Sequence, residues 1–286
     1  MTRSYSSILA VALLLIIAGA TSIQAQVNWW RLDNETAITM EWSKADFAGR
    51  IADELGFFNT ILFLGAQIRV SPSVNLVAEL PITTWDVKDP MVYDLGWYFY
   101  DWEDEQAIGN PYLGLEYSRP GAPILFALGV RPPLASDDKL FAAVVGLFGA
   151  ADRFEAFVPD LWTFSLAIGG RSSATVGPAY RFLIGPTLLV PDAGDAEVLL
   201  DWSALFGFRG TIAHAGFEYA GRMILTENYD DLGDRFDQFI GLVGGLNIGQ
   251  VEPGVQFRYA IDDEYREWID FTFGINLKIR LGAEEE

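Results

Sequence analysis

The only histidine in the chain, His214, is followed by two charged residues at even spacing. Glu218 and Arg222 come four and eight residues later, so in an extended strand all three side chains leave the same face. A hydrolase of the Ser–His type needs a hydroxyl within hydrogen-bond reach of the imidazole and a group that orients the ring. Ser203 falls on the same face of the preceding predicted strand, so a Ser203–His214 pair stays open. A polar histidine that lines an interior without catalysis is the interpretation that we favour.

These residues belong to a pattern of alternating apolar and polar positions that runs through the chain. From Trp268 to Leu281 every second residue is apolar, and the intervening ones include Lys278 and Arg280. A period of two is typical of a β-strand, and this run would span roughly 45 Å at about 3.3 Å per residue. None of the outward positions is charged, as expected if a basic residue facing lipid costs about 2–4 kcal/mol. Twelve strands are predicted, over residues 36–42, 60–70, 74–84, 110–118, 124–131, 161–171, 178–190, 197–209, 211–226, 239–248, 251–261 and 268–281.

The connections between these strands alternate between short turns and longer, acidic loops. Outer-membrane barrels have short periplasmic turns, longer external loops and an even number of strands. A secreted soluble β-protein also alternates, but with its charged face outward. Strand length, aromatic residues near strand ends and the asymmetry of the loops favour the membrane. The short connections fall at 71–73, 119–123, 172–177, near 210 and at 249–250.

On these features the chain resembles the bacterial outer-membrane β-barrel proteins as a class, over about residues 36–281. Its closing strand, ending Asn276 to Leu281, is similar to the terminal strand that barrel assembly machinery reads, although a Glu-rich tail follows instead of a terminal aromatic residue. The resemblance implies an all-β fold, a closed antiparallel up-and-down transmembrane β-barrel of about 12 strands, with ten and fourteen as alternatives. It implies the bacterial outer membrane as location, with outer-membrane lipid and the assembly machinery as partners.

Hydrolases of this class act at the lipid-facing surface, where this chain offers little chemistry. Ala213 and Ala215 flank His214 on that side, and the His-x-Ser spacing of the phospholipase is missing. We therefore expect no enzyme activity. The sequence has no phosphate loop, metal-ligand cluster or dinucleotide fingerprint, so no cofactor and no metal are expected either.

Charged residues on the inward face are the candidates for a function in the lumen. About eight strands make a barrel filled by side chains and 16–18 leave an aqueous channel, so twelve allow a narrow pore. Basic residues near the periplasmic strand ends would attract anions by focused potential. Alternatively they pair with inward carboxylates and brace the barrel, which we favour. The predicted pore-lining residues are Glu79, Arg181, Asp201, His214, Glu218, Arg222, Arg258 and Asp270. The predicted basic residues of the periplasmic mouth are Arg69, Arg171, Arg209, Lys278 and Arg280.

Two long loops have distinct compositions. Residues 85–109 combine aromatic and acidic side chains, which can hold sugars or calcium, although the spacing matches no EF-hand. We favour an interfacial aromatic girdle with solvated acids. In residues 132–160, Asp137 and Asp138 are predicted to cap a helix that runs to about Ala151. Its apolar stripe predicts either a plug that folds inward or an apolar binding surface at the outer face of the barrel. The stripe consists of Leu140, Val144, Leu147 and Phe148.

The ends and the composition complete the expectations. Residues 1–25 are predicted to be a secretion signal peptide, cleaved after Ala20 or Ala25, and residues 26–286 the barrel; a retained helical anchor is the alternative. The net charge of −20 argues against nucleic acid as a partner, and the chain has no cysteine. We expect a narrow channel or transporter for small hydrophilic or amphipathic solutes. The alternatives are a closed structural or surface-binding barrel and, less favoured, a membrane-embedded lipid hydrolase.

Overall fold

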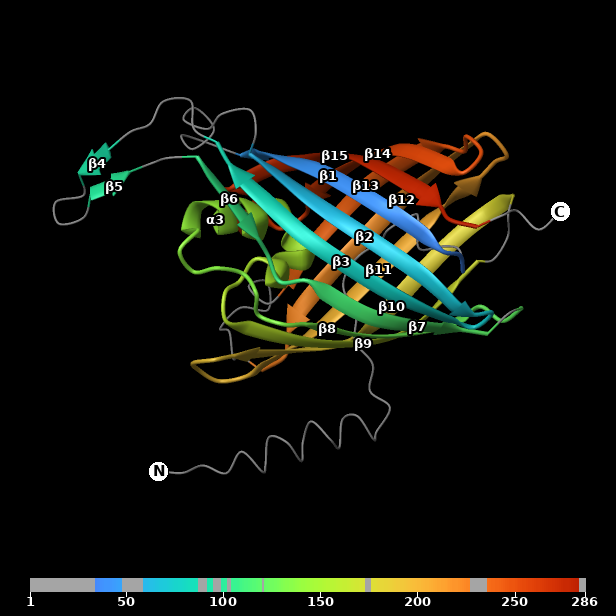
Figure 1. Cartoon of the computed structure of the whole chain (residues 1–286), viewed down its shortest axis with the longest axis horizontal. Helices are drawn as coiled ribbons and strands as arrows, with labels where there is room; N and C mark the ends of the chain where they lie inside the picture. Colours follow the sequence, from blue (N-terminus) through green and yellow to red (C-terminus); the bar gives the residue numbers. More distant parts are fainter. Residues whose placement is uncertain are drawn as a thin grey trace, which may run out of the picture.

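The computed structural model describes residues 34–47, 59–86, 92–94, 99–101, 104–119, 121–172, 176–226 and 236–282. These residues form a closed antiparallel β-barrel whose strands follow one another around the wall in chain order (Figure 1). The predicted signal peptide, residues 1–25, lies outside the described residues. In the described part of the chain, no helix is long and apolar enough to cross a membrane.

The wall contains the twelve strands that alternation predicts. Thirteen strands share one sheet, and β6 (Glu105–Ile108) only extends the pairing of β3, so twelve complete the circuit. The circuit closes because β1 pairs with β15 and β2 pairs with β3. A separate hairpin of β4 (Val92–Asp94) and β5 (Phe99–Asp101) lies between β3 and β6. The wall strands are β1 (Ala37–Phe47), β2 (Thr60–Ser71), β3 (Val74–Trp85), β7 (Tyr112–Ser118), β8 (Ile124–Arg131), β9 (Leu161–Arg171), β10 (Gly177–Pro191), β11 (Glu197–Arg209), β12 (Ala213–Ile224), β13 (Phe236–Leu246), β14 (Val251–Ala260) and β15 (Ile269–Arg280).

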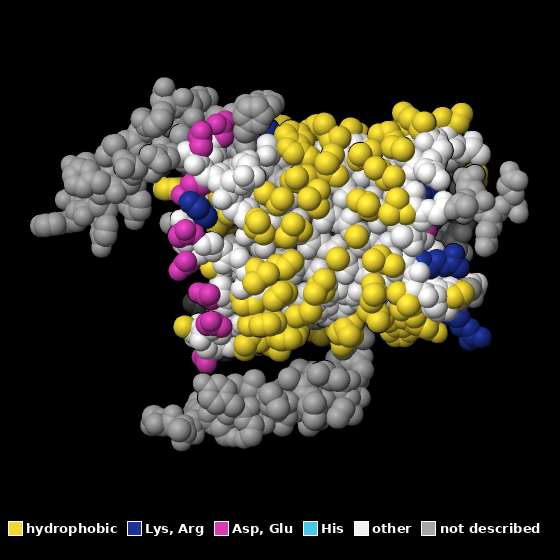
Figure 2. Space-filling view, in the orientation of Figure 1, with side chains coloured by type: hydrophobic (Ala, Val, Ile, Leu, Met, Phe, Trp, Pro, Cys, Tyr) yellow, Lys and Arg dark blue, Asp and Glu magenta, His cyan; other side chains and the backbone are white. Residues whose placement is uncertain are grey.

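The outer surface of the barrel carries the apolar face of each strand. Leu64, Ile68 and Leu76 expose 40%, 52% and 46% of their surfaces, and such side chains form the broad belt in Figure 2. Acidic side chains gather at one end of this belt and basic ones at the other (Figure 2). Arg69 and Arg119 are exposed beside short turns, which identify the basic end as the periplasmic one. The surface is therefore a lipid-facing band between two water-facing rims.

Replacing Leu64 with arginine tests this placement of the belt. Leu64 lies in the middle of β2, paired with Met40 and Leu80, so the new charge would sit near the bilayer midplane. We expect Leu64→Arg to lower the free energy of unfolding in lipid vesicles by about 2–4 kcal/mol, measured by urea titration. The matched variant is Ile248→Arg, because Ile248 is 59% exposed at a periplasmic turn and should cost only about 0–1 kcal/mol. Equal losses for both variants would contradict the assignment.

The last strand departs from its predicted alternation at the outer end. Asp46 pairs with Phe271 whereas Phe47 pairs with Ile269, so a bulge accommodates Asp270. A bulge places one extra residue on one side of the ladder and reverses the faces of the side chains that follow it. Ile269 therefore points inward and is 2% exposed, whereas Asp270 is exposed at the end of the strand. The prediction that Asp270 lines the pore is wrong.

Candidate functional site

The loop between β8 and β9 fills the outer half of the lumen. Helix α3 (Leu140–Gly149) and the 3-10 helix η2 (Ala151–Ala156) lie within the wall near its outer end (Figure 1); we call residues 140–156 the plug. Ala142 and Val145 of α3 are fully buried in one apolar cluster with inward side chains such as Ile61 and Trp85. Of the two courses predicted for this loop, the structure shows the inward one. A short helix, α4 (Asp263–Arg266), connects β14 with β15.

The helix of the plug does not begin as predicted. Neither Asp137 nor Asp138 caps it, since no side chain of its own N-terminal residues makes a capping hydrogen bond. Instead, the Glu105 carboxylate of β6 accepts hydrogen bonds from the amides of Phe141 and Ala142, both at 3.1 Å. A carboxylate at this place satisfies two orphan N–H groups of the first turn and complements the helix dipole. The cap therefore comes from the wall and docks the helix onto it.

The buried face of α3 consists of Ala142, Val145, Gly146 and Gly149, and Phe148 of the predicted stripe packs against the same apolar cluster. A Cβ added to Gly146 would lie 2.2 Å from the Phe157 ring, and one added to Gly149 would lie 2.6 Å from the Ile61 side chain. Only glycine allows these approaches, because the helix must fit inside a closed wall. The helical period in the sequence could not show this, because such a period is recognised from the spacing of large apolar residues. The predicted stripe was Leu140, Val144, Leu147 and Phe148.

Asn110 fastens both ends of the plug loop to the wall. Its side-chain nitrogen donates to the carbonyl oxygens of Glu155 and Val158, at 3.0 and 2.7 Å. Its side-chain oxygen accepts from the amides of Leu134 and Ala135, both at 2.7 Å. The residue itself is 0% exposed. These four hydrogen bonds satisfy the side-chain amide and hold the segments that lead into and out of the plug.

The backbone beside Asn110 interrupts the wall strand. The amide of Asn110 donates to the Ala156 carbonyl at 2.6 Å instead of to a wall strand. A Cβ on Gly109 would lie 2.1 Å from the same carbonyl oxygen, so glycine is needed for the approach of the two backbones. The strand predicted to begin at residue 110 therefore begins at Tyr112, and β6 forms its outer continuation along β3.

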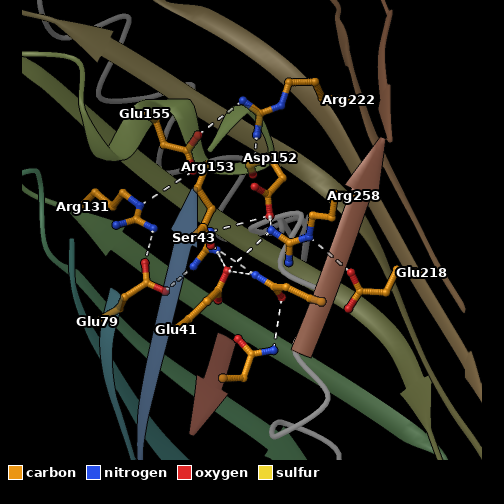
Figure 3. Close-up of polar contacts among 12 residues, drawn as sticks. Glu41, Ser43, Glu79, Arg131, Asp152, Arg153, Glu155, Glu218, Arg222 and Arg258 are labelled. Carbon is orange, nitrogen blue, oxygen red and sulfur yellow. Dashed lines mark hydrogen bonds and ion pairs between the residues drawn. The ribbon is translucent and has the colours of Figure 1, made fainter. Parts of the chain in front are cut away.

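Arg153 of the plug is the centre of a buried charge network (Figure 3). It is 1% exposed and makes an ion pair with Glu41 of β1. A second ion pair, at 3.2 Å, joins it to Glu79 of β3. The guanidinium also lies 3.4 Å from the centroid of the Phe63 ring, close enough for a cation–π contact. One plug side chain thus joins two wall strands.

Three arginines of the wall complete the network, and each touches the plug (Figure 3). Arg131 lies 3.7 Å from Glu155 and Arg222 lies 3.3 Å from the same carboxylate. Arg258 lies 3.2 Å from Asp152. Each of the three also has a carboxylate of the wall: Glu79 at 2.7 Å for Arg131, Asp201 at 3.5 Å for Arg222, and Glu218 at 3.3 Å for Arg258. The predicted residues Glu79, Asp201, Glu218, Arg222 and Arg258 therefore meet in one network.

The inner half of the lumen is filled by wall side chains. Arg181 makes an ion pair with Glu116 at 2.9 Å, and Arg171 lies 4.0 Å from the same residue. The apolar side chains of the inner wall are wholly buried as well, although they face the barrel axis. The interpretation that inward basic residues brace the barrel agrees with these contacts. Three of the apolar side chains expose 0% of their surface: Leu125, Ala167 and Leu205.

At the periplasmic end, two predicted mouth residues close the seam between the first and the last strand. Lys278 and Arg280 of β15 both make ion pairs with Glu35, which precedes β1. Both also contact Glu252 of β14, Lys278 at 3.3 Å. These basic side chains are thus paired with carboxylates rather than presented to solutes.

His214 is separated from the serine that the sequence left open as its partner. Its Nδ1 lies 3.2 Å from the Asn247 side-chain oxygen, and its backbone pairs with that of Arg209, which is buried. Ser203 instead pairs with Ala220, six residues further along β12. At about 3.3 Å per residue the distance is roughly 20 Å. The Ser203–His214 pair does not form.

Sequence reasoning missed five members of the network: Glu41, Arg131, Asp152, Arg153 and Glu155. Alternation did contain a signal for Glu41, because it falls between the outward residues Met40 and Trp42. The plug residues follow a short helix in a loop, where no strand period marks the direction of a side chain.

The side chains of residues 87–103, in the aromatic and acidic loop 85–109, lie outside the described part of the structure, so a sugar or calcium site there stays a prediction. Trp85 is an exception: it is 4% exposed and stacks on Phe141 of the plug at 5.2 Å. It therefore does not belong to an outer girdle. Among the residues that the structure describes, no group of three histidine, cysteine or acidic side chains is arranged to hold a metal ion.

Solved structures with a similar fold include three proteins at 7–9% sequence identity. An outer-membrane channel from Pseudomonas putida F1 has a TM-score of 0.57 at 9% identity, covering 86% of this chain and 96% of its own. LpxR from Salmonella typhimurium has a TM-score of 0.52 at 9% identity, with 86% and 100% covered. The NanC porin has a TM-score of 0.51 at 7% identity, with 86% and 100% covered. No family model and no curated protein matches the chain.

The chain has the fold of the bacterial outer-membrane β-barrels. The strands that the structure describes close into one circuit without a free edge strand, and the apolar belt faces outward. These properties locate the protein in the bacterial outer membrane.

Proposed function

We propose that this protein is a narrow channel or transporter for small solutes, closed by the plug in the state described above. The observation that carries the proposal is that each wall arginine in contact with the plug also pairs with a carboxylate of the wall. These arginines would therefore keep a partner if the plug withdrew. A buried charge that loses its only partner costs about 3–5 kcal/mol, and withdrawal of the plug creates no such charge in the wall. The remaining pairs are Arg131 with Glu79, Arg222 with Asp201, and Arg258 with Glu218.

The nature of the plug contacts supports a movable element. Replacing a buried ion pair by apolar residues of similar volume is often neutral or stabilising, by about 1–4 kcal/mol, so a barrel that only needs a filled interior gains little from these charges. The charged plug residues would be solvated after withdrawal. The plug also belongs to one external loop between Arg131 and Leu161, and its departure breaks no pairing between the wall strands. The similar fold of a channel and of a porin agrees with this proposal.

A closed structural or surface-binding barrel is the second candidate, and the dense inner half favours it. Leu205 and Ala167 face the axis below the plug and expose 0% of their surface. In a barrel of this kind the plug would only add to a continuous core. We propose no catalytic role for His214, whose described contact is the Asn247 side chain.

Deleting the plug distinguishes the two candidates. We expect a variant with residues 140–156 replaced by a short Gly-Ser linker to show discrete conductance steps in planar bilayers, whereas the intact protein stays closed for most of the time. Heat-modifiable migration on gels and tryptophan fluorescence would confirm that the variant is folded. A folded variant without conductance at any voltage would leave the closed barrel as the better proposal. Ester hydrolysis lost on His214→Ala would instead support a membrane-embedded hydrolase.

A further inference from the structure

Three small cavities form a row along one side of the lumen, against β12 to β15. The outer cavity lies between Phe148 of the plug and Tyr265. The middle cavity shares Asp152, Phe239 and Arg258 with it. The inner cavity shares Glu218 with the middle one and reaches Lys278 near the periplasmic end. The row therefore passes the plug and continues below it.

Each cavity is about the size of one water molecule. The outer and inner cavities measure about 20 Å³ each and the middle one about 10 Å³, compared with about 10–15 Å³ needed to hold a water. The lining of the inner cavity includes the polar side chains of His214, Gln256 and Asn276, which could hydrogen-bond a water molecule there. The three cavities thus form a row of water-sized spaces that are separated by side chains.

The plug is also fastened to the neighbouring part of the wall, which begins at β1 beside β15. Arg153 and Asn110 hold it to β1, β3 and the interruption before β7, and Phe63 and Trp85 pack against it there. On the side of β12 to β15 its charged contacts are those of Arg222 and Arg258, and two of the cavities lie beside it. The plug also packs on this side, where Phe148 stacks on Trp268 at 5.1 Å and Arg222 lies over the Phe154 ring, so the cavities are gaps within a made contact.

Glycines line two of the cavities. Gly241 of β13 lines the middle cavity and Gly254 of β14 lines the inner one. In the wall of β8 to β10, the inward residues Leu125 and Leu183 form a buried apolar cluster and both pair with Gly169. Both sides of the lumen carry buried polar groups, and the three cavities lie on the side of β12 to β15.

Arg258 separates the outer cavity from the rest of the row. Its guanidinium lies 3.2 Å from Asp152, 3.3 Å from Glu218 and 3.6 Å from Glu41. It thus occupies, as a tethered cation, a place surrounded by three carboxylates. If the side chain swings aside, the same carboxylates face a passage of water size, and such a ring selects cations.

We propose that small cations cross the barrel along this row, between the plug and β12 to β15, with Arg258 as the gate at its narrowest point. The inference rests on the proposed function, since it names the route and the solute class of the channel. Anions and larger solutes are excluded by the carboxylates and by the width of the passage.

Single cysteines test the route, because the native chain contains none. Ala220 lines the middle cavity, whereas Ala167 is an equally small inward residue in the packed wall, 0% exposed. We expect Ag⁺, a small cation that binds thiolates, to consume the thiol of Ala220→Cys at least about tenfold faster than that of Ala167→Cys in the otherwise intact protein. The remaining thiol is titrated after unfolding. Equal rates would overturn the route.

Conductance of Arg258→Gln tests the gate. We expect steps with a reversal potential that shifts toward the cation potential in a salt gradient. Arg181→Gln removes an inward arginine that lines none of the three cavities, and it should leave the reversal potential unchanged. A plug-deletion variant that conducts while Ala220→Cys stays as unreactive as its control would preserve the channel and overturn this route. No conductance in any folded variant would remove the channel itself. If Arg258→Gln does not fold, the two cysteines still decide the route.

Discussion

Replacing Arg153 with methionine is expected to loosen the plug by about 3 kcal/mol, the lower end of the cost of breaking a buried ion pair. The methionine fills part of the space, but Glu41 and Glu79 lose a counter-charge that was 1% exposed. The lower end applies because Arg131 and Arg258 still face these carboxylates. The contact with the Phe63 ring, at 3.4 Å, is lost as well.

Proteolysis of the plug measures this loss. Chymotrypsin cleaves after aromatic residues, and Phe157, which directly follows the plug, is 1% exposed in the closed state. When opening is fast relative to cleavage, the cleavage rate follows the population of the open form. A loss of about 3 kcal/mol should therefore raise the rate about 100-fold. Openings in planar bilayers should become more frequent in the same variant.

Two variants control for a general loss of stability. Arg181→Met removes an arginine of the same burial whose ion pair, to Glu116, lies outside the plug; it should destabilise the barrel without accelerating cleavage in the plug. Adding Glu41→Gln to Arg153→Met removes one of the two carboxylates left behind and should restore part of the protection. If Arg181→Met and Arg153→Met accelerated cleavage equally, the plug would not be held by Arg153.

Replacing Asn110 with alanine is expected to release the two ends of the plug loop together. Four hydrogen bonds are lost, to Glu155, Val158, Leu134 and Ala135. At about 1 kcal/mol for each hydrogen bond, the plug is expected to lose about 4 kcal/mol of stability. The freed backbone groups must then form hydrogen bonds with water. Cleavage at Phe157 and urea unfolding in vesicles measure the effect on the plug and on the barrel.

An isosteric variant separates this effect from simple loss of volume. Asn110→Asp keeps the volume and an acceptor for the amides of Leu134 and Ala135, but it sets a buried carboxylate against the carbonyls of Glu155 and Val158, so we expect a loss at least as large as that of Asn110→Ala. Asn247→Ala removes a side chain that bonds His214 and the Gly210 carbonyl near a periplasmic turn. It should leave cleavage of the plug unchanged. A larger effect of Asn247→Ala than of Asn110→Ala would refute the role of Asn110.

Alternation by itself determined the wall of this protein. The side-chain period of a strand is two, so charged and apolar residues in Thr60–Ser71 or Glu197–Arg209 could be assigned to opposite faces without a structure. The positions of the short turns then indicated the direction of each strand and an even number of strands. The pattern failed at Asp270, because a bulge depends on pairing with another strand and leaves no mark in its own strand.

The tertiary structure alone decided what fills the barrel. Glu41, Glu79 and Arg153 are far apart in the sequence, and nothing in their local spacing announces that they meet. The same holds for Glu105, which caps a helix more than thirty residues away. Local periods report the direction of a side chain relative to its own strand or helix. Which charge it meets across the lumen depends on closure of the wall and on the course of a single loop.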